Sequence, residues 1–169
     1  MEIRINPKWQ TDIPGEFHVL PGGKIDFKKE AGIVTLPKDY LEFMLFSDGL
    51  GTRQRDGWFI SQFTEGPVIL PLEYLSEMEN VIRGTNFRMA TFIDRSGPAI
   101  PPGFIVIGAT ENDFKVLLGV DENNADFGKV YAWPDSMDAW MQGNNTKGLG
   151  LAGNTFTEFM NSLSARDEL

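Results

Sequence analysis

Cysteine is absent from this chain of 169 residues, and histidine occurs once, at His18. Without cysteine the protein can form no disulfide, no cysteine-ligated zinc site and no iron–sulfur cluster, and it has no thiol nucleophile. A single histidine excludes a metal site with several histidine ligands. Catalysis by a Ser-His pair would have to use His18, and no Gly-x-Ser-x-Gly sequence accompanies it. We therefore expect no catalytic, metal or cofactor site and no enzyme activity, and we interpret His18 as a surface or half-buried residue.

Long apolar runs are also missing. No stretch approaches the roughly 18 apolar residues that a membrane-spanning helix needs. The first residues lack the basic and then apolar pattern of a signal peptide. Together with the absence of cysteine, these features lead us to expect a cytoplasmic protein with no membrane partner.

Basic residues are in the minority, with 15 Lys and Arg against 24 Asp and Glu, for a net charge of −9. An acidic chain repels phosphate backbones, so we expect no nucleic-acid partner. The acids gather between residues 111 and 138. This stretch is either a solvated face that maintains solubility or half of an electrostatic interface. Its acidic residues are Glu111, Asp113, Asp121, Glu122, Asp126, Asp135 and Asp138.

The length and the hydrophobic content of 41% fit one globular domain with a core of its own. Residues 1–24 carry short alternating apolar patterns broken by Pro and Gly, and we interpret them as an N-terminal extension. Residues 25–169 would then form the domain.

Helical patterns occur in both halves of the chain. A short helix is predicted over residues 25–32, closed by Gly32. Residues 36–46 form a longer one, with Pro37 in its first turn and a buried stripe. A third is expected near residues 75–83. The last begins at residues 155–158, Thr-Phe-Thr-Glu, whose order is that of a capping box.

Strand patterns occupy the middle of the chain. Residues 57–63 and 67–70 read as strands. Three further runs, 104–108, 114–120 and 129–133, are separated by gaps of hairpin length. Sequential strands with short turns favour an antiparallel meander. With helices at both ends, the prediction is an α+β fold whose central antiparallel sheet is flanked by helices.

Two segments resemble ligand-binding motifs but lack features that those motifs require. Residues 148–153 spell Gly-x-Gly-x-x-Gly, but no βαβ unit can follow, so we interpret them as a flexible loop. Residues 121–126 resemble a calcium loop, yet Ala125 and Asp126 stand where a ligand and a glycine are needed. Only a weak, adventitious cation site is left as an alternative there.

The order of several short motifs resembles the SUKH superfamily, the Smi/Knr-like domains. In that family a Leu-Pro-x-x-Tyr-x-x-Phe segment precedes an Asn-Gly-Gly turn, and Asp48 stands here where Asn is usual. The resemblance covers about residues 25–163. It is carried by Leu36-Pro37, Tyr40, Phe43-Met44, Asp48-Gly49-Leu50-Gly51, Ile107-Gly108, Val116-Leu117-Leu118, Gly128-Lys129-Val130-Tyr131-Ala132-Trp133, Phe156 and Phe159.

The resemblance implies a non-catalytic protein-binding domain of the bacterial immunity type. Such proteins neutralise toxins, often nucleases, and an acidic inhibitor suits the basic cleft of a nuclease. Alternatives are a regulatory or scaffold domain that binds an endogenous protein, as in the eukaryotic relatives, and an unrecognised enzyme. The expected partner-binding residues, in loops between the predicted strands, are Glu111, Asp113, Asp121, Glu122 and Asp126.

Structural roles follow from the same motifs. Gly49 and Gly51 are expected to make the turn after the helix over residues 36–46. The core is expected to contain Leu36, Tyr40, Phe43, Trp58, Tyr131, Trp133, Phe156 and Phe159.

Overall fold

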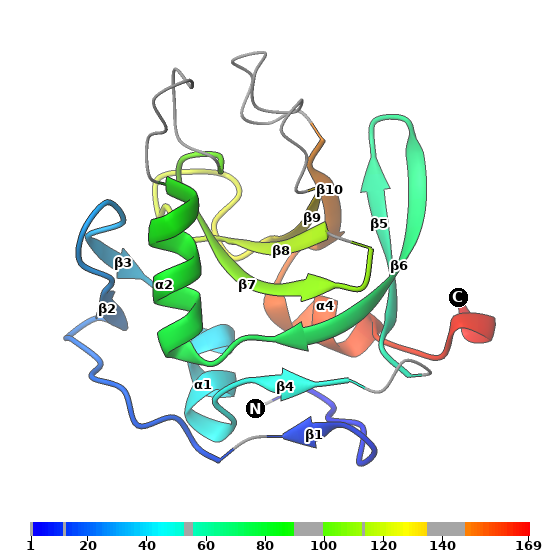
Figure 1. Cartoon of the computed structure of the whole chain (residues 1–169), viewed down its shortest axis with the longest axis horizontal. Helices are drawn as coiled ribbons and strands as arrows, with labels where there is room; N and C mark the ends of the chain where they lie inside the picture. Colours follow the sequence, from blue (N-terminus) through cyan, green and yellow to red (C-terminus); the bar gives the residue numbers. More distant parts are fainter. Residues whose placement is uncertain (1, 12, 53–55, 90–99, 113, 135–147) are drawn as a thin grey trace.

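The computed structural model describes residues 2–11, 13–52, 56–89, 100–112, 114–134 and 148–169. Figure 1 shows the arrangement of the elements. The described helices are α1 (Lys38–Phe46), α2 (Met78–Met89), α4 (Phe156–Ser162) and the 3₁₀ turn η1 (Arg166–Glu168). The described strands are β1 (Gln10–Thr11), β2 (Lys24–Asp26), β3 (Ile33–Thr35), β4 (Leu50–Gly51), β5 (Trp58–Phe63), β6 (Gly66–Leu75), β7 (Phe104–Thr110), β8 (Phe114–Gly119), β9 (Val130–Pro134) and β10 (Gly150–Gly153).

The central sheet is antiparallel and closes on itself. Its strands follow the order β6-β5-β10-β9-β8-β7, and β6 pairs again with β7 to complete the ring. β6 can serve both neighbours because it is 10 residues long: its first part pairs with β5 and its end with β7. β1 and β4 continue the sheet beyond β6. The structure confirms the α+β class and the antiparallel sheet, and it adds a closure that the predicted meander flanked by helices did not contain.

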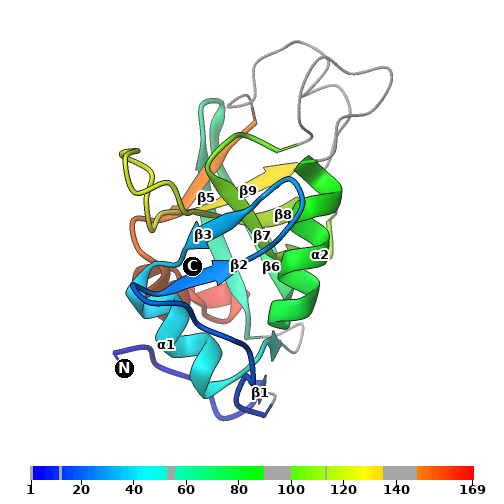
Figure 2. The ribbon, with the colours of Figure 1, turned by 90° about the vertical axis from the view of Figure 1, so that its left-hand side faces the viewer.

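The helices lie on two sides of this sheet. α1 and α4 lie near one another, and α2 runs along β7 on another side (Figures 1 and 2). α4 begins as predicted, because the Thr155 hydroxyl accepts a hydrogen bond from the Glu158 N–H at 3.0 Å. The Glu158 carboxylate in turn accepts from the backbone N–H of Asn154. No helix in the described part of the chain is long and apolar enough to cross a membrane.

Most of the expected core is buried. Trp58 and Tyr131 are the exceptions, since both are only half-buried. The Trp58 ring lies at the surface under the Arg166 guanidinium, 4.9 Å from the ring centroid, and the Tyr131 hydroxyl reaches Asp126. The confirmed core residues are Leu36, Tyr40, Phe43, Trp133, Phe156 and Phe159.

Residues before position 25 contribute to the same core. Ile3 and Trp9 are 7% and 6% exposed and belong to the main hydrophobic cluster. The indole N–H of Trp9 donates to the carbonyl of Asp56, and β1 pairs with β4. The segment that the sequence suggested as an extension therefore packs against the domain.

The predicted helix over residues 25–32 is wrong. β2 and β3 form a hairpin there, and Ile25 pairs with Val34. Ile25 and Phe27 are buried while Asp26 between them is exposed, the period of two that belongs to a strand. Gly32 has a φ of 63° and lies in the hairpin turn, so it closes a turn and not a helix.

The predicted flexible loop over residues 148–153 is also wrong in part, because Gly150–Gly153 forms β10 between β5 and β9. A Cβ atom on Gly150 would lie 2.4 Å from the Phe63 ring and 2.5 Å from the Ser61 hydroxyl. The glycine that resembled part of a dinucleotide loop serves instead to let two strands approach closely.

Candidate functional site

Helix α2 forms one wall of a groove, and the first turn of the helix is held by a residue far away in sequence. The Asp48 carboxylate accepts a hydrogen bond from the Met78 N–H at 2.7 Å. Gly49, which follows, has a φ of 105° and makes the expected turn, whereas Gly51 lies in β4. Asp48 thus accepts a hydrogen bond from one of the N–H groups that have no partner within the first turn of a helix. The asparagine that is usual in the family at this position has a side-chain oxygen that can accept the same hydrogen bond.

The inner face of α2 is fixed to the sheet by both packing and hydrogen bonding. Met78 and Val81 are buried in the main core. The buried Thr85 hydroxyl accepts a hydrogen bond from the Val106 N–H at 3.0 Å. Val106 lies at a register shift between β7 and β8, so this hydroxyl satisfies a donor where the ladder is irregular.

Asn86 connects α2 to the β2–β3 hairpin. Its amide donates to the carbonyl of Phe27 at 2.7 Å and accepts from the Ala31 N–H at 3.2 Å. The helix continues through Gly84, which the sequence pattern had placed after its end. These contacts anchor α2 at its start, along its inner face and on one side, and they leave its outer face uncovered by the sheet.

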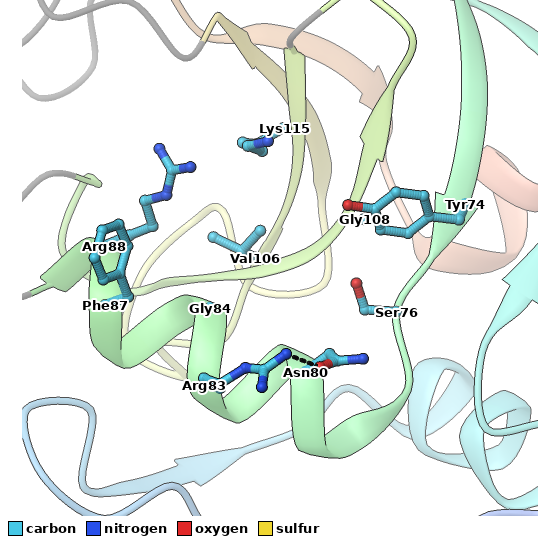
Figure 3. A pocket seen from close by; sticks show the side chains of 10 residues that line it. All are labelled: Tyr74, Ser76, Asn80, Arg83, Gly84, Phe87, Arg88, Val106, Gly108 and Lys115. Atoms are coloured by element: carbon cyan, nitrogen blue, oxygen red, sulfur yellow. Dashed lines mark hydrogen bonds between the residues drawn. The ribbon is translucent and has the colours of Figure 1, made fainter.

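The outer face of α2 and strands β6 to β8 enclose an open groove of about 490 Å³. In Figure 3, the Tyr74 hydroxyl projects into the groove from the side opposite Arg88, and Val106 lies between them. Gly84 leaves the helix wall bare, since a Cβ atom there would meet nothing within 4 Å. The groove is lined by Tyr74, Ser76, Asn80, Arg83, Gly84, Phe87, Arg88, Val106, Gly108 and Lys115.

The described lining of the groove is cationic although the protein is acidic. Arg83, Arg88 and Lys115 line it, and no Asp or Glu is among its described lining residues. The Arg83 guanidinium donates to the Asn80 side-chain oxygen at 2.6 Å, which orients it along the helix. The Arg88 guanidinium lies 5.7 Å from the centroid of the Phe87 ring. Sequence reasoning missed this groove because its residues come from separate parts of the chain.

The loop between β8 and β9 holds three of the five expected partner-binding acids. The Asp121 carboxylate accepts from the Asn123 N–H at 3.0 Å, and Glu122 accepts from the Thr35 hydroxyl at 2.9 Å. Asp126 accepts from both the Tyr131 hydroxyl, at 2.8 Å, and the Lys129 ammonium, at 3.2 Å. Asp121 and Glu122 remain exposed. The loop is therefore ordered by the same side chains that give it charge.

Asp126 is the most structurally engaged of these acids. Its carbonyl oxygen lies so close to Gly119 that a Cβ there would fall 2.0 Å from it. Partial burial, followed by the hydrogen bond and the negative charge of Asp126, raises the pKa of Tyr131 above its ordinary value. The Asp126 carboxylate thus binds Lys129 at the end of its own loop and Tyr131 in the adjoining strand β9.

The structure does not bring all five acids together. Glu111 is exposed at the turn between β7 and β8, and Asp113 lies outside the described residues. That turn and the Asp121–Asp126 loop are at opposite ends of β8, a strand of 6 residues, or about 20 Å of rise. His18 is exposed on the segment before β2.

A closed antiparallel sheet with short helices on two sides defines the class of this protein, a small α+β domain. Within that class, the segments that carry the resemblance lie at its central positions: α1, the Asp48-Gly49 turn, β7 to β9 and α4. The chain belongs to the SMI1 / KNR4 family (SUKH-1), whose sequence model matches residues 25–162. No curated protein and no solved structure matches the chain. Family membership is consistent with an immunity-type or protein-binding role.

Proposed function

We propose that this protein is a non-catalytic immunity protein that neutralises a bacterial toxin by binding it through an acidic surface. The observation that carries the proposal is the ordered acidic loop between β8 and β9, on a chain with a net charge of −9. A toxin that acts on nucleic acid has a cationic cleft for phosphates. Carboxylates held at fixed positions would occupy such a cleft and speed the encounter.

The hydrogen bonds within the loop support this role. A carboxylate on a mobile loop loses conformational entropy when it binds, whereas Asp121 and Glu122 are already positioned by Asn123 and Thr35. Glu111 lies at the opposite end of β8 from this loop. It would belong to the same interface only if the partner covers the whole length of that strand. A standard interface of about 800 Å² per partner is about 30 Å wide, enough to include both ends.

Two measurements test the proposal. The first coexpresses this protein with each product of the neighbouring genes that is toxic when expressed alone, and it scores growth. We expect rescue from one of them, and a failure to rescue from any would contradict the proposal. The second measures the association rate with that toxin at low salt.

The variants for the rate measurement remove charge and keep the hydrogen-bond acceptors. Asp121→Asn, Glu122→Gln and Asp126→Asn are combined, and we expect association to slow by about tenfold, with the difference shrinking as salt is added. The matched control neutralises three exposed acids elsewhere, Glu65→Gln, Asp167→Asn and Glu168→Gln. Equal slowing by both sets would show that net charge, and not this loop, steers the encounter.

A further inference from the structure

The described lining of the groove beside α2 carries positive charge, whereas the protein as a whole is acidic. Its three cations come from two elements, Arg83 and Arg88 from α2 and Lys115 from β8. Lys115 lies near the start of β8, and the acidic Asp121–Asp126 loop follows the end of that strand. The groove is therefore separate from the Asp121–Asp126 loop, and it lies at the end of β8 that also carries Glu111 in the turn after β7.

The shape and lining of the groove fit part of a peptide. Its volume of about 490 Å³ accommodates a few side chains. Tyr74 and Phe87, 41% and 60% exposed, present aromatic surface at its walls. Exposed aromatic residues together with arginine are the composition that dominates binding energy at protein interfaces. The bare helix surface at Gly84 lets a backbone or a side chain approach α2 closely.

The charge of the lining selects among occupants. Guanidinium and ammonium groups in one lining attract carboxylates. The planar guanidinium of Arg83 can donate two parallel hydrogen bonds to the two oxygens of one carboxylate. A nucleic acid would need a longer basic stripe to offset its repulsion from a chain of net charge −9. An acidic protein segment needs only the local charge.

We propose that this groove is the docking site for an acidic segment of the partner protein, with a carboxylate of the segment at Arg83 and an apolar side chain against Tyr74 and Phe87. This docking site rests on one part of the proposed function, namely that the partner is a protein. Two surfaces of opposite charge would then fix the orientation of the complex. The acidic loop repels acidic parts of the partner, and the cationic groove repels basic parts.

The test observes the full chain by amide NMR during titration with short peptides. One peptide carries glutamates around a phenylalanine, and its counterpart carries glutamines in their place. We expect saturable shifts of the Ser76, Gly84 and Gly108 amides with the glutamate peptide at up to millimolar concentration. Equal binding of the glutamine peptide, or no saturable shift at these amides, would overturn the proposal. Tighter binding of single-stranded DNA at the same amides would assign the groove to nucleic acid instead.

Variants identify the groups responsible. Arg83→Glu should weaken the glutamate peptide by about tenfold. Lys38→Glu is the matched control, because Lys38 is exposed on α1 away from the groove lining and the change in net charge is the same. An equal loss in both variants would contradict docking at the groove. Gly84→Leu fills the groove from a position with open space, so it should abolish the shifts even if Arg83→Glu does not fold.

This experiment separates the two proposals. Peptide binding that fails while the toxin is still neutralised overturns the groove assignment alone. Peptide binding that succeeds while no toxin is neutralised overturns the immunity role and leaves the groove as a docking site for an acidic segment.

Discussion

The Asp48 carboxylate accepts a hydrogen bond from the backbone N–H of Met78 at 2.7 Å, across 30 positions of sequence. It connects the end of α1 to the start of α2 and so sets the position of the groove wall. Replacing Asp48 by Ala should lower the free energy of unfolding by about 1 kcal/mol, whereas Asn should preserve it. Urea denaturation measures both, with the exposed Asp167→Ala as control. Equal losses for Ala and Asn would show that the charge matters and not the acceptor.

Asp39 makes a second connection of this kind, between α1 and α4. Its carboxylate accepts from the backbone N–H of Thr157 at 2.8 Å and from the Thr157 hydroxyl at 3.0 Å. A double-mutant cycle with Asp39→Ala and Thr157→Val should give a coupling energy of about 1 kcal/mol. Additive effects of the two substitutions would contradict the hydroxyl's part in the contact.

Tyr40 should make the protein sensitive to alkaline pH. Burial, and to a lesser extent the negative charge of Asp48, raises the pKa of Tyr40 above its ordinary value. The native state therefore keeps its proton when the unfolded chain, with a tyrosine pKa of about 10, has begun to lose it. Below a pH of about 10 the protonated Tyr40 costs the native state nothing relative to the unfolded chain. Above that pH, the free energy of unfolding falls by about 1.4 kcal/mol per pH unit.

Tyr40→Phe isolates this effect. The Tyr40 hydroxyl is buried and has no hydrogen-bond partner among the described residues. The substitution should leave stability at neutral pH unchanged or raise it by about 1 kcal/mol. It should also make the loss between pH values of about 9 and 11 shallower. Unfolding free energies measured across that range would contradict the assignment if the two proteins declined in parallel.

Two glycines of the groove should respond in opposite ways to the same substitution. A Cβ atom on Gly108 would lie 2.4 Å from the backbone carbonyl oxygen of Tyr74, whereas one on Gly84 would meet nothing within 4 Å. Gly108→Ala should cost about 1 to 3 kcal/mol because two strands must separate. Gly84→Ala should gain up to about 1 kcal/mol through helix propensity. Thermal unfolding of both variants checks the pair, and a stable Gly108→Ala would refute the close approach.

Predictions from the sequence were confirmed where a local pattern was unambiguous. The helix over residues 36–46 and the capped helix after Thr155 were predicted because apolar spacing and capping depend on neighbouring residues. The strands from 104 to 133 were predicted because alternation and hairpin-length gaps are local too. The order of those segments also sufficed to indicate the family.

Errors arose where a local pattern was ambiguous. Residues 25–32 could be read as a short helix because a span of eight residues ending in glycine fits a helix stop as well as a hairpin turn. Residues 148–153 looked like a loop because glycines are poor strand formers, yet the crowding of Phe63 and Ser61 against Gly150 selects glycine there. In both cases the deciding contacts come from another strand.

The sequence by itself determined the absence of cysteine chemistry, the α+β class, the family and the net charge. Only the tertiary structure decided how those charges are distributed. It closes the sheet through β6, places Glu111 and the Asp121–Asp126 loop at opposite ends of β8, and collects Arg83, Arg88 and Lys115 around one groove. The reason is physical: composition and periodicity are properties of neighbours along the chain, whereas a surface is made by segments that strand pairing and helix packing bring together.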